Sequence, residues 1–215
     1  MKKETMLLFD LDGTLWDSGK EVADSWNEIL IEKIKDFRPL NADDVHSVMG
    51  KTMDDISKVI LPDIDAEQRK KIFGECMENE NKFLSIKGAK LYPGVVWTLE
   101  NLRDLGYNLA IVSNCQKGYI NAFLTSMKVG NLFCDYEEWG NTFLLKADNI
   151  RLVLERNGYH KGIYIGDTGG DGDSARKAGL PFIHASYGFG TDDKADAEIS
   201  SFDELLQIIP TLEKY

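Results

Sequence analysis

The sequence predicts an α/β fold, a Rossmann-like doubly wound parallel sheet core with an inserted α-helical cap domain. Short apolar runs at 6–11, 109–112 and 162–165 have the length and composition of strands that are buried on both faces. Helical patterns separate the later runs, and this alternation is typical of a parallel sheet with helices on both sides. Residues 17–87, in contrast, show helical periodicity with no convincing strand.

The long helical stretch follows the first predicted strand. Val22, Trp26 and Ile29 recur at three- and four-residue steps, which places them on one face of a helix. Two prolines inside the stretch predict breaks, so we expect a bundle of about four helices. The predicted division of the chain is an α/β core of residues 1–16 and 88–215 and a cap of residues 17–87.

The rest of the chain alternates between helix and strand. One helix that stops at Gly106 and another that stops at Gly158 each precede an apolar run, and glycine commonly ends helices. The predicted elements here are helices 95–105, 118–127, 149–157, 174–178 and 202–212 and strands 109–112, 162–165 and 181–185. In such sheets, ligands bind beyond the carboxyl ends of the strands.

Composition and charge narrow the possible roles. The 215 residues have a formal net charge of -11, which disfavours broad binding to nucleic acid or to anionic membranes. Cys76, Cys115 and Cys134 form no metal-binding or redox motif and are expected to be reduced thiols. No signal peptide or membrane-spanning segment is evident. We therefore expect a cytoplasmic protein, monomeric or homodimeric, that folds without disulfides.

Two acidic motifs stand at the ends of predicted strands. The motif at 9–15, FDLDGTL, places Asp10 and Asp12 two residues apart, and their carboxylates point the same way if the strand continues through them. Taken alone, this motif also fits an ordinary acidic turn. The motif at 166–171, GDTGGD, follows a later strand. A strand before it, and no glutamate at the twelfth loop position, disfavour a helix-loop-helix calcium site.

A third strand end carries Ser113 and Asn114. A hydroxyl and neighbouring backbone N–H groups can hold a phosphate oxygen without adding charge. By itself such a pair is more often a turn or a helix cap. Its position between the two acidic motifs favours a site.

The order of these motifs resembles that of the haloacid-dehalogenase-like hydrolases. FDLDGTL is similar to the first motif of that family, AIVSN at 110–114 to the second and GDTGGD to the fourth. The resemblance implies that Asp10 is a nucleophile that forms an aspartyl-phosphate and that Asp12 is the general acid and base. It also implies Mg²⁺, held by Asp10, Asp167 and the backbone carbonyl of Asp12, with Asp171 in the outer shell.

The family's third motif is a lysine whose ammonium neutralises the phosphate and the nucleophile. Lys146 is the candidate, because it stands directly before a predicted helix that leads into the strand before GDTGGD. Many relatives have Lys-Pro here and a longer gap to the acidic loop, where this chain has Lys-Ala. Lys161 is the alternative. The predicted phosphate-binding set is Ser113, Asn114 and Lys146.

The insertion resembles the helical cap of phosphoglycolate phosphatase and β-phosphoglucomutase relatives, which closes over the substrate. Within it, Gly50 permits a close approach of the backbone, and Lys51 could bind a second anionic end of the substrate. A plain link between two helices explains the same residues equally well.

The resemblance implies a phosphatase that acts on a small phosphorylated metabolite, either phosphoglycolate-like or a sugar phosphate. Asp12 favours phosphate chemistry over dehalogenation, because a halide leaving group needs no proton. Three alternatives stay open: a β-phosphoglucomutase-like phosphomutase, a phosphonoacetaldehyde-type hydrolase in which Lys51 forms a Schiff base, and a catalytically silent metabolite-binding protein. No partner other than the substrate is expected.

Overall fold

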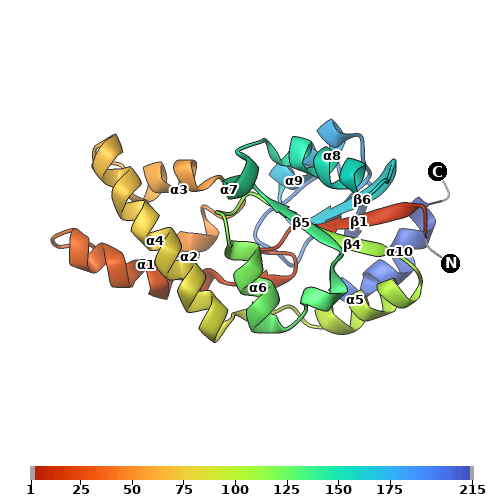
Figure 1. Cartoon of the computed structure of the whole chain (residues 1–215), viewed down its shortest axis with the longest axis horizontal. Helices are drawn as coiled ribbons and strands as arrows, with labels where there is room; N and C mark the ends of the chain where they lie inside the picture. Colours follow the sequence, from red (N-terminus) through yellow and green to blue (C-terminus); the bar gives the residue numbers. More distant parts are fainter. Residues whose placement is uncertain (1–2, 214–215) are drawn as a thin grey trace.

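A parallel sheet with helices on both faces forms one part of the molecule, and a helical insertion extends from it (Figure 1). The computed structural model describes residues 3–213. Six parallel strands pair in the order β5-β4-β1-β6-β7-β8, which confirms the predicted α/β class. The strand bounds are β1 Thr5–Phe9, β4 Asn108–Ser113, β5 Asp135–Glu138, β6 Lys161–Gly166, β7 Phe182–Ala185 and β8 Ala197–Ile199.

The central strand β1 is buried on both faces, as its continuous apolar sequence requires. Leu7 and Phe9 belong to the larger hydrophobic core, while Met6 and Leu8 point to the opposite face and belong to the smaller one. The larger core is completed by α5 (Val95–Asp104), α6 (Tyr119–Met127) and α10 (Leu205–Leu212), and the smaller by α8 (Lys146–Arg156) and α9 (Gly169–Ala178). Figure 1 shows these two groups on opposite sides of the sheet.

The insertion consists of four helices between β1 and β4. They are α1 (Gly19–Lys33), α2 (Ala42–His46), α3 (Met53–Ile60) and α4 (Ala66–Lys87). α1 packs along α4, where the Trp26 and Phe73 rings lie 5.2 Å apart, and α4 also packs against α6 of the sheet part. The chain enters and leaves the insertion through a short antiparallel pair, β2 (Trp16–Asp17) and β3 (Lys90–Leu91).

The two edge strands of the sheet, β5 and β8, were not expected from the sequence. β5 reads DYEE, and its acidic residues face Arg156, which forms ion pairs with Asp135 and Glu137. Edge strands are short and carry charges that discourage pairing with another chain, so they lack the apolar run that identifies a central strand. The short helix α7 (Trp139–Thr142) and the 3₁₀ turn at Gly130–Leu132 also lie outside the predicted elements, and the predicted helix 202–212 begins with a 3₁₀ turn at Phe202–Glu204 before α10.

Two element boundaries differ from the predictions in ways that affect the site. β1 ends at Phe9, so the extended backbone expected through residue 11 does not continue past Asp10. α9 begins at Gly169, whereas the sequence predicted a start at 174, because Thr168 and Asp171 form a capping box that offsets the low helix propensity of the glycines. No helix in the described residues is long and apolar enough to cross a membrane.

Candidate active site

The carboxyl ends of β1, β4 and β6 meet at one edge of the sheet, and the residues that follow them form the candidate site. Phe9 pairs with Ile111 on one side and Ile165 on the other, so the three strands end at nearly the same level. The backbone N–H of Asp10 donates to the carbonyl of Ile165 at 2.8 Å, which fixes Asp10 beside the end of β6. Asp10 is only 3% exposed.

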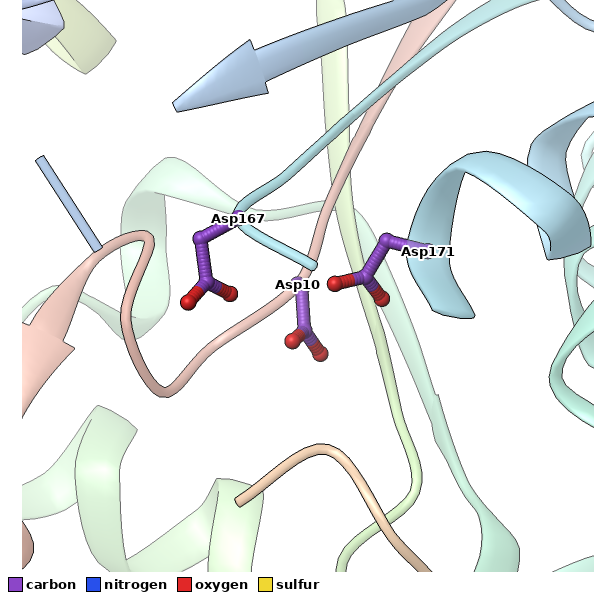
Figure 2. A group of neighbouring side chains, drawn as sticks. All are labelled: Asp10, Asp167 and Asp171. Atoms are coloured by element: carbon purple, nitrogen blue, oxygen red, sulfur yellow. The ribbon is translucent and has the colours of Figure 1, made fainter. Parts of the chain in front are cut away.

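Three carboxylates from separate segments converge at this edge. Figure 2 shows Asp10 between Asp167, which follows β6, and Asp171, which lies in the first turn of α9. One oxygen from each lies within 4.8 Å of the other two. The predicted outer-shell residue Asp171 is held firmly, because its Oδ2 accepts hydrogen bonds from the N–H and hydroxyl of Thr168 at 3.0 and 2.6 Å.

Lys146 is the cation of this cluster. It is the first residue of α8 and is 4% exposed, and its Nζ donates to Asp10 Oδ1 at 3.0 Å and to Asp171 Oδ1 at 2.6 Å. Burial alone would lower the pKa of the ammonium, but the Asp10 and Asp171 carboxylates raise it well above its ordinary value. Lys161 is the first residue of β6, so it lies at the amino end of this strand, away from the site at the carboxyl ends, and it is exposed.

The ionised forms of Asp10 and Asp167 are disfavoured unless a further positive charge is bound. Burial, with the negative charge of Asp171, raises the pKa of Asp10 to about 7 and that of Asp167 to about 8. Asp167 Oδ2 accepts from the N–H of Phe189 at 2.7 Å, but its buried Oδ1 has no hydrogen-bond partner in the described part of the chain. A divalent cation would satisfy that oxygen and neutralise the cluster, so these residues fit Mg²⁺.

Gly13 and Gly188 make room for Asp167. Gly13 has a φ of +79°, and a Cβ on it would lie 2.1 Å from Asp167 Oδ2. A Cβ on Gly188 would lie 2.3 Å from Asp167 Cβ. Any side chain at either position would displace the carboxylate, so both glycines are required for this geometry. Gly13 belongs to the predicted motif FDLDGTL, whereas no sequence pattern identified Gly188 as a site residue.

Asp12 faces a different set of partners from Asp10. Its Oδ1 accepts hydrogen bonds from Ser18 Oγ at 2.6 Å and from Trp16 Nε1 and Tyr119 Oη at 2.8 Å. Burial raises the pKa of Asp12 above its ordinary value, although these donors lower it. Trp16 and Ser18 follow the first motif closely, but Tyr119 comes from α6 and could be found only in the folded chain.

A pocket between the sheet and the insertion opens onto Asp10 and Asp12. Ser113 and Asn114 line it from the end of β4, and Lys51 from the insertion, so the structure brings these predicted residues together. Asn114 Nδ2 donates to the carbonyl of Gly50 at 2.9 Å, which joins the two parts across the pocket. Lys51 is exposed at the rim, and the cavity volume is about 30 Å³, room for roughly two water molecules.

Comparison with known proteins agrees with this geometry. The haloacid dehalogenase-like hydrolase family profile matches residues 7–185. A phosphoglycolate phosphatase of Rhodobacter capsulatus is 29% identical over 191 residues, covering 85% of this chain and 84% of the relative. One of Aquifex aeolicus is also 29% identical, covering 86% and 85%. These relatives confirm the predicted resemblance to the phosphoglycolate phosphatase branch.

Solved structures show the same fold. A crystal structure described as a predicted phosphoglycolate phosphatase, from Haemophilus somnus, superposes with a TM-score of 0.84 at 23% identity. The superposition covers 96% of this chain and 99% of that one, so the likeness includes the helical insertion as well as the sheet. The family profile, which spans the sheet edge and its converging acids, is decisive: the chain belongs to the haloacid dehalogenase-like hydrolases.

Proposed function

We propose that this protein is a Mg²⁺-dependent phosphatase that hydrolyses a small phosphorylated metabolite, phosphoglycolate-like or a sugar phosphate, through an aspartyl-phosphate on Asp10. The observation that carries the proposal is the convergence of Asp10, Lys146 and Asp167 at one sheet edge, beneath the pocket that Asp12 also lines. The names of the phosphoglycolate phosphatase relatives support the phosphatase activity.

Asp10 attacks phosphorus in the first step. A bond forms between a carboxylate oxygen of Asp10 and phosphorus while the bond from phosphorus to the ester oxygen breaks. The attack requires the ionised carboxylate, and burial opposes ionisation by raising the pKa of Asp10 to about 7. Lys146, 3.0 Å away, offsets that effect and holds the attacking group in place.

Asp12 moves the proton in both steps. It donates a proton to the departing ester oxygen, and then takes one from the water that attacks phosphorus and releases phosphate from Asp10. Three donors occupy its Oδ1, which leaves Oδ2 to carry the proton. The raised pKa of Asp12 suits this role, because the protonated form persists at a higher pH than for an exposed aspartate.

The remaining predicted residues bind the phosphoryl group and the cation. The Ser113 hydroxyl, Asn114 and Lys146 would hold the phosphate oxygens, with Asn114 released from Gly50 when substrate enters. Asp10, Asp167 and the carbonyl of Asp12 would hold Mg²⁺, with Asp171 in the outer shell. When bound, Mg²⁺ neutralises the carboxylates and phosphate oxygens that would otherwise repel each other.

We further propose that residues 17–87 act as a cap that opens to admit substrate, over a core of residues 1–16 and 88–215. The cavity of about 30 Å³ is small, and we expect the insertion and the sheet to separate when a phosphate monoester enters. β2 and β3 join the two parts and are the place where such a movement can occur.

Turnover of p-nitrophenyl phosphate by the purified protein tests the proposed function. We expect hydrolysis that requires Mg²⁺ and stops with EDTA, and we expect Asp10→Asn to abolish it while thermal unfolding stays nearly unchanged. Ca²⁺ should not restore activity, because its larger and looser coordination shell misplaces the nucleophile. Undiminished turnover by Asp10→Asn would remove Asp10 from the mechanism.

A further inference from the structure

The hydroxyl of Tyr119 reaches Asp12 from a distant part of the chain. Trp16 and Ser18 follow Asp12 by four and six residues, so they lie in the same segment as the carboxylate that they bind. Tyr119 is the first residue of α6 and lies 107 residues further along, and its Oη donates to Asp12 Oδ1 at 2.8 Å. The tyrosine is 2% exposed, so solvent has little access to this hydrogen bond.

The backbone around Tyr119 is fixed to the sheet. Glu138, the last residue of β5, accepts hydrogen bonds from the backbone N–H groups of Gly118 and Ile120 at 2.6 and 3.3 Å. These two residues flank Tyr119 in the chain. Tyr119 and Ile120 also belong to the larger hydrophobic core, whose close packing restricts movement. The sheet and this core therefore set the position of the Tyr119 hydroxyl, independently of the segment that carries Asp12.

Ser18 provides separate evidence that this corner of the site is arranged around Asp12. It is the N-cap residue of α1, and a serine hydroxyl at that position commonly accepts a backbone hydrogen bond that stabilises the helix. The Ser18 side chain makes no such cap bond. Its Oγ donates to Asp12 Oδ1 instead, and it lies 2.8 Å from Tyr119 Oη. A helix cap is thus given up for a second hydroxyl on the same carboxylate oxygen.

These donors determine which way the Asp12 carboxylate faces. Asp12 is partly exposed and lines the pocket, and with three donors around Oδ1 the oxygen left to face the leaving group is Oδ2. A rotation of this side chain would carry the proton of Oδ2 beyond hydrogen-bond reach of the ester oxygen. Trp16 and Ser18 belong to the segment of Asp12 itself. The hydrogen bond from Tyr119 is therefore the one that fixes the carboxylate relative to the sheet.

We propose that Tyr119 is a positioning residue for the proton transfer, a role that rests on the proposed phosphatase activity. Its hydroxyl holds Asp12 Oδ1 against α6, so that Oδ2 presents its proton to the departing ester oxygen. That proton moves from Asp12 to the ester oxygen as the bond from this oxygen to phosphorus breaks. Tyr119 keeps its own proton and touches neither the substrate nor the phosphoryl group.

Two aryl phosphates of similar shape and different leaving groups test this role. p-Nitrophenolate is a stable anion that leaves with little help from an acid, whereas p-methylphenolate needs a proton far more. In Mg²⁺, Tyr119→Phe should lower kcat/KM about tenfold for p-methylphenyl phosphate and less than about threefold for p-nitrophenyl phosphate. Phenylalanine keeps the ring, so the change isolates the hydroxyl. A merely structural role of Tyr119 would lower both values by the same factor.

Tyr107→Phe is the matched control. Its Oη also donates to a carboxylate, Glu213 Oε2 at 2.7 Å, and it is 3% exposed, but it precedes β4 at the amino ends of the strands. Both kcat/KM values should stay within about twofold of the wild type. Asp12→Asn removes the transferred proton and should show the selective loss more strongly. If Asp12→Asn shows it and Tyr119→Phe does not, the positioning role is wrong and the proposed function stands.

Crystal structures of Tyr119→Phe and Tyr107→Phe separate this role from the proposed function, because they need no turnover. With Mg²⁺ bound, we expect the Asp12 carboxylate to occupy more than one rotamer in Tyr119→Phe and a single rotamer in the control. That result supports the positioning role even if the protein hydrolyses neither aryl phosphate. An Asp12 carboxylate that keeps its single orientation in Tyr119→Phe would contradict the role even if the protein proves to be a phosphatase.

Discussion

At the residue scale, the site is a set of buried charges that are stable only together. Lys146 lies between Asp10 and Asp171 at ion-pair distance, and each of these three side chains is at most 4% exposed. Removing Lys146 would leave two buried carboxylates without their cation, which is far more damaging than losing an exposed pair. Asp10→Asn is milder, because Lys146 keeps its pair with Asp171 and the repulsion between Asp10 and Asp171 is removed. The residues of this cluster should therefore respond to substitution in ways that surface residues do not.

The first prediction concerns Lys146, the candidate phosphate lysine, and Lys161, its alternative. Lys146→Met should lower kcat/KM roughly 10²- to 10³-fold, because the nucleophile and the phosphate lose their nearest positive charge. Lys161→Met should keep activity within about twofold, since Lys161 is exposed at the other edge of the sheet. Steady-state assays of both variants measure these effects. A large loss of activity in Lys161→Met with little loss in Lys146→Met would show that Lys146 is not the phosphate lysine.

A second prediction concerns Gly13. Gly13→Ala should destabilise the protein by about 1–3 kcal/mol and weaken Mg²⁺ binding, because its positive φ and its contact with Asp167 both exclude a Cβ. Gly74→Ala is the matched control. Gly74 lies within α4 with no atom near its missing Cβ, so alanine there should stabilise by about 0.5–1 kcal/mol. Urea titrations with and without Mg²⁺ measure both effects, and a neutral Gly13→Ala would contradict the packing described.

At the element scale, strand ends and helix starts position the chemistry, and they also mark how far the sequence could predict it. The apolar runs of β1, β4 and β6 identified the central strands, and the polar residues after them identified Asp10, Ser113 and Asp167. The start of α9 was hidden by glycines that only the capping box explains. β5 was not predicted, because an edge strand of charged residues lacks the apolar run that identifies a central strand.

Contacts between elements were beyond prediction for a different reason. Tyr119 bonds to Asp12, and Glu80 lines the pocket, because α4 and α6 pack against each other in the folded chain. Neither residue carries a local pattern that distinguishes it from an ordinary helical residue. A single sequence shows what each segment is, but the partner of a helix face depends on tertiary packing.

The third prediction concerns His46, the last residue of α2, to which the sequence gave no role. Its Nε2 lies 2.8 Å from Asp17 Oδ1, and its ring stacks on Phe189, whose N–H holds Asp167. His46→Ala removes both contacts, each worth about 1 kcal/mol. The stacking on Phe189 joins the insertion to the sheet part, and the contact with Asp17 orients the ring for it. We expect KM to rise about threefold to tenfold with a smaller change in kcat, as the closed form becomes less populated.

The exposed His160→Ala provides the control for this prediction and should leave KM unchanged. A normal KM in His46→Ala, with activity otherwise intact, would show that His46 does not help to hold the insertion against the sheet.

At the scale of the whole molecule, the sheet edge and the insertion enclose a site whose charge balance depends on a cation. The chain as a whole is acidic, with a net charge of -11, yet it gathers Asp10, Asp167 and Asp171 in one buried place around a single lysine. Such a cluster is held together by the fold and opposed by electrostatic repulsion. Mg²⁺ should therefore contribute to stability as well as to catalysis.

The fourth prediction follows from the raised pKa values of Asp10 and Asp167, about 7 and about 8 without metal. Both values exceed the ordinary pKa of 3.8 for an aspartate. The folded protein therefore binds more protons than the unfolded chain at pH values between 3.8 and the raised pKa of each residue. The stability of the metal-free protein should fall as pH rises through this window. Mg²⁺ replaces the protons, so its stabilising effect should grow over the same range.

Thermal unfolding at pH 6 and pH 8.5, with Mg²⁺ and with EDTA, measures this coupling. We expect a larger Mg²⁺-induced increase in Tm at the higher pH and almost none in Asp167→Asn at either pH. An increase that is equal at both values, or larger at pH 6, would be inconsistent with a cluster that exchanges protons for metal.

The most direct test of the central claim, that Asp10 accepts the phosphoryl group, is mass spectrometry of peptides from protein quenched in acid during turnover. We predict a phosphoryl group on the peptide that contains Asp10, present only with Mg²⁺ and absent from Asp10→Asn. A phosphoryl group on another residue, or product formation in the first turnover with no phosphorylated peptide, would contradict the account.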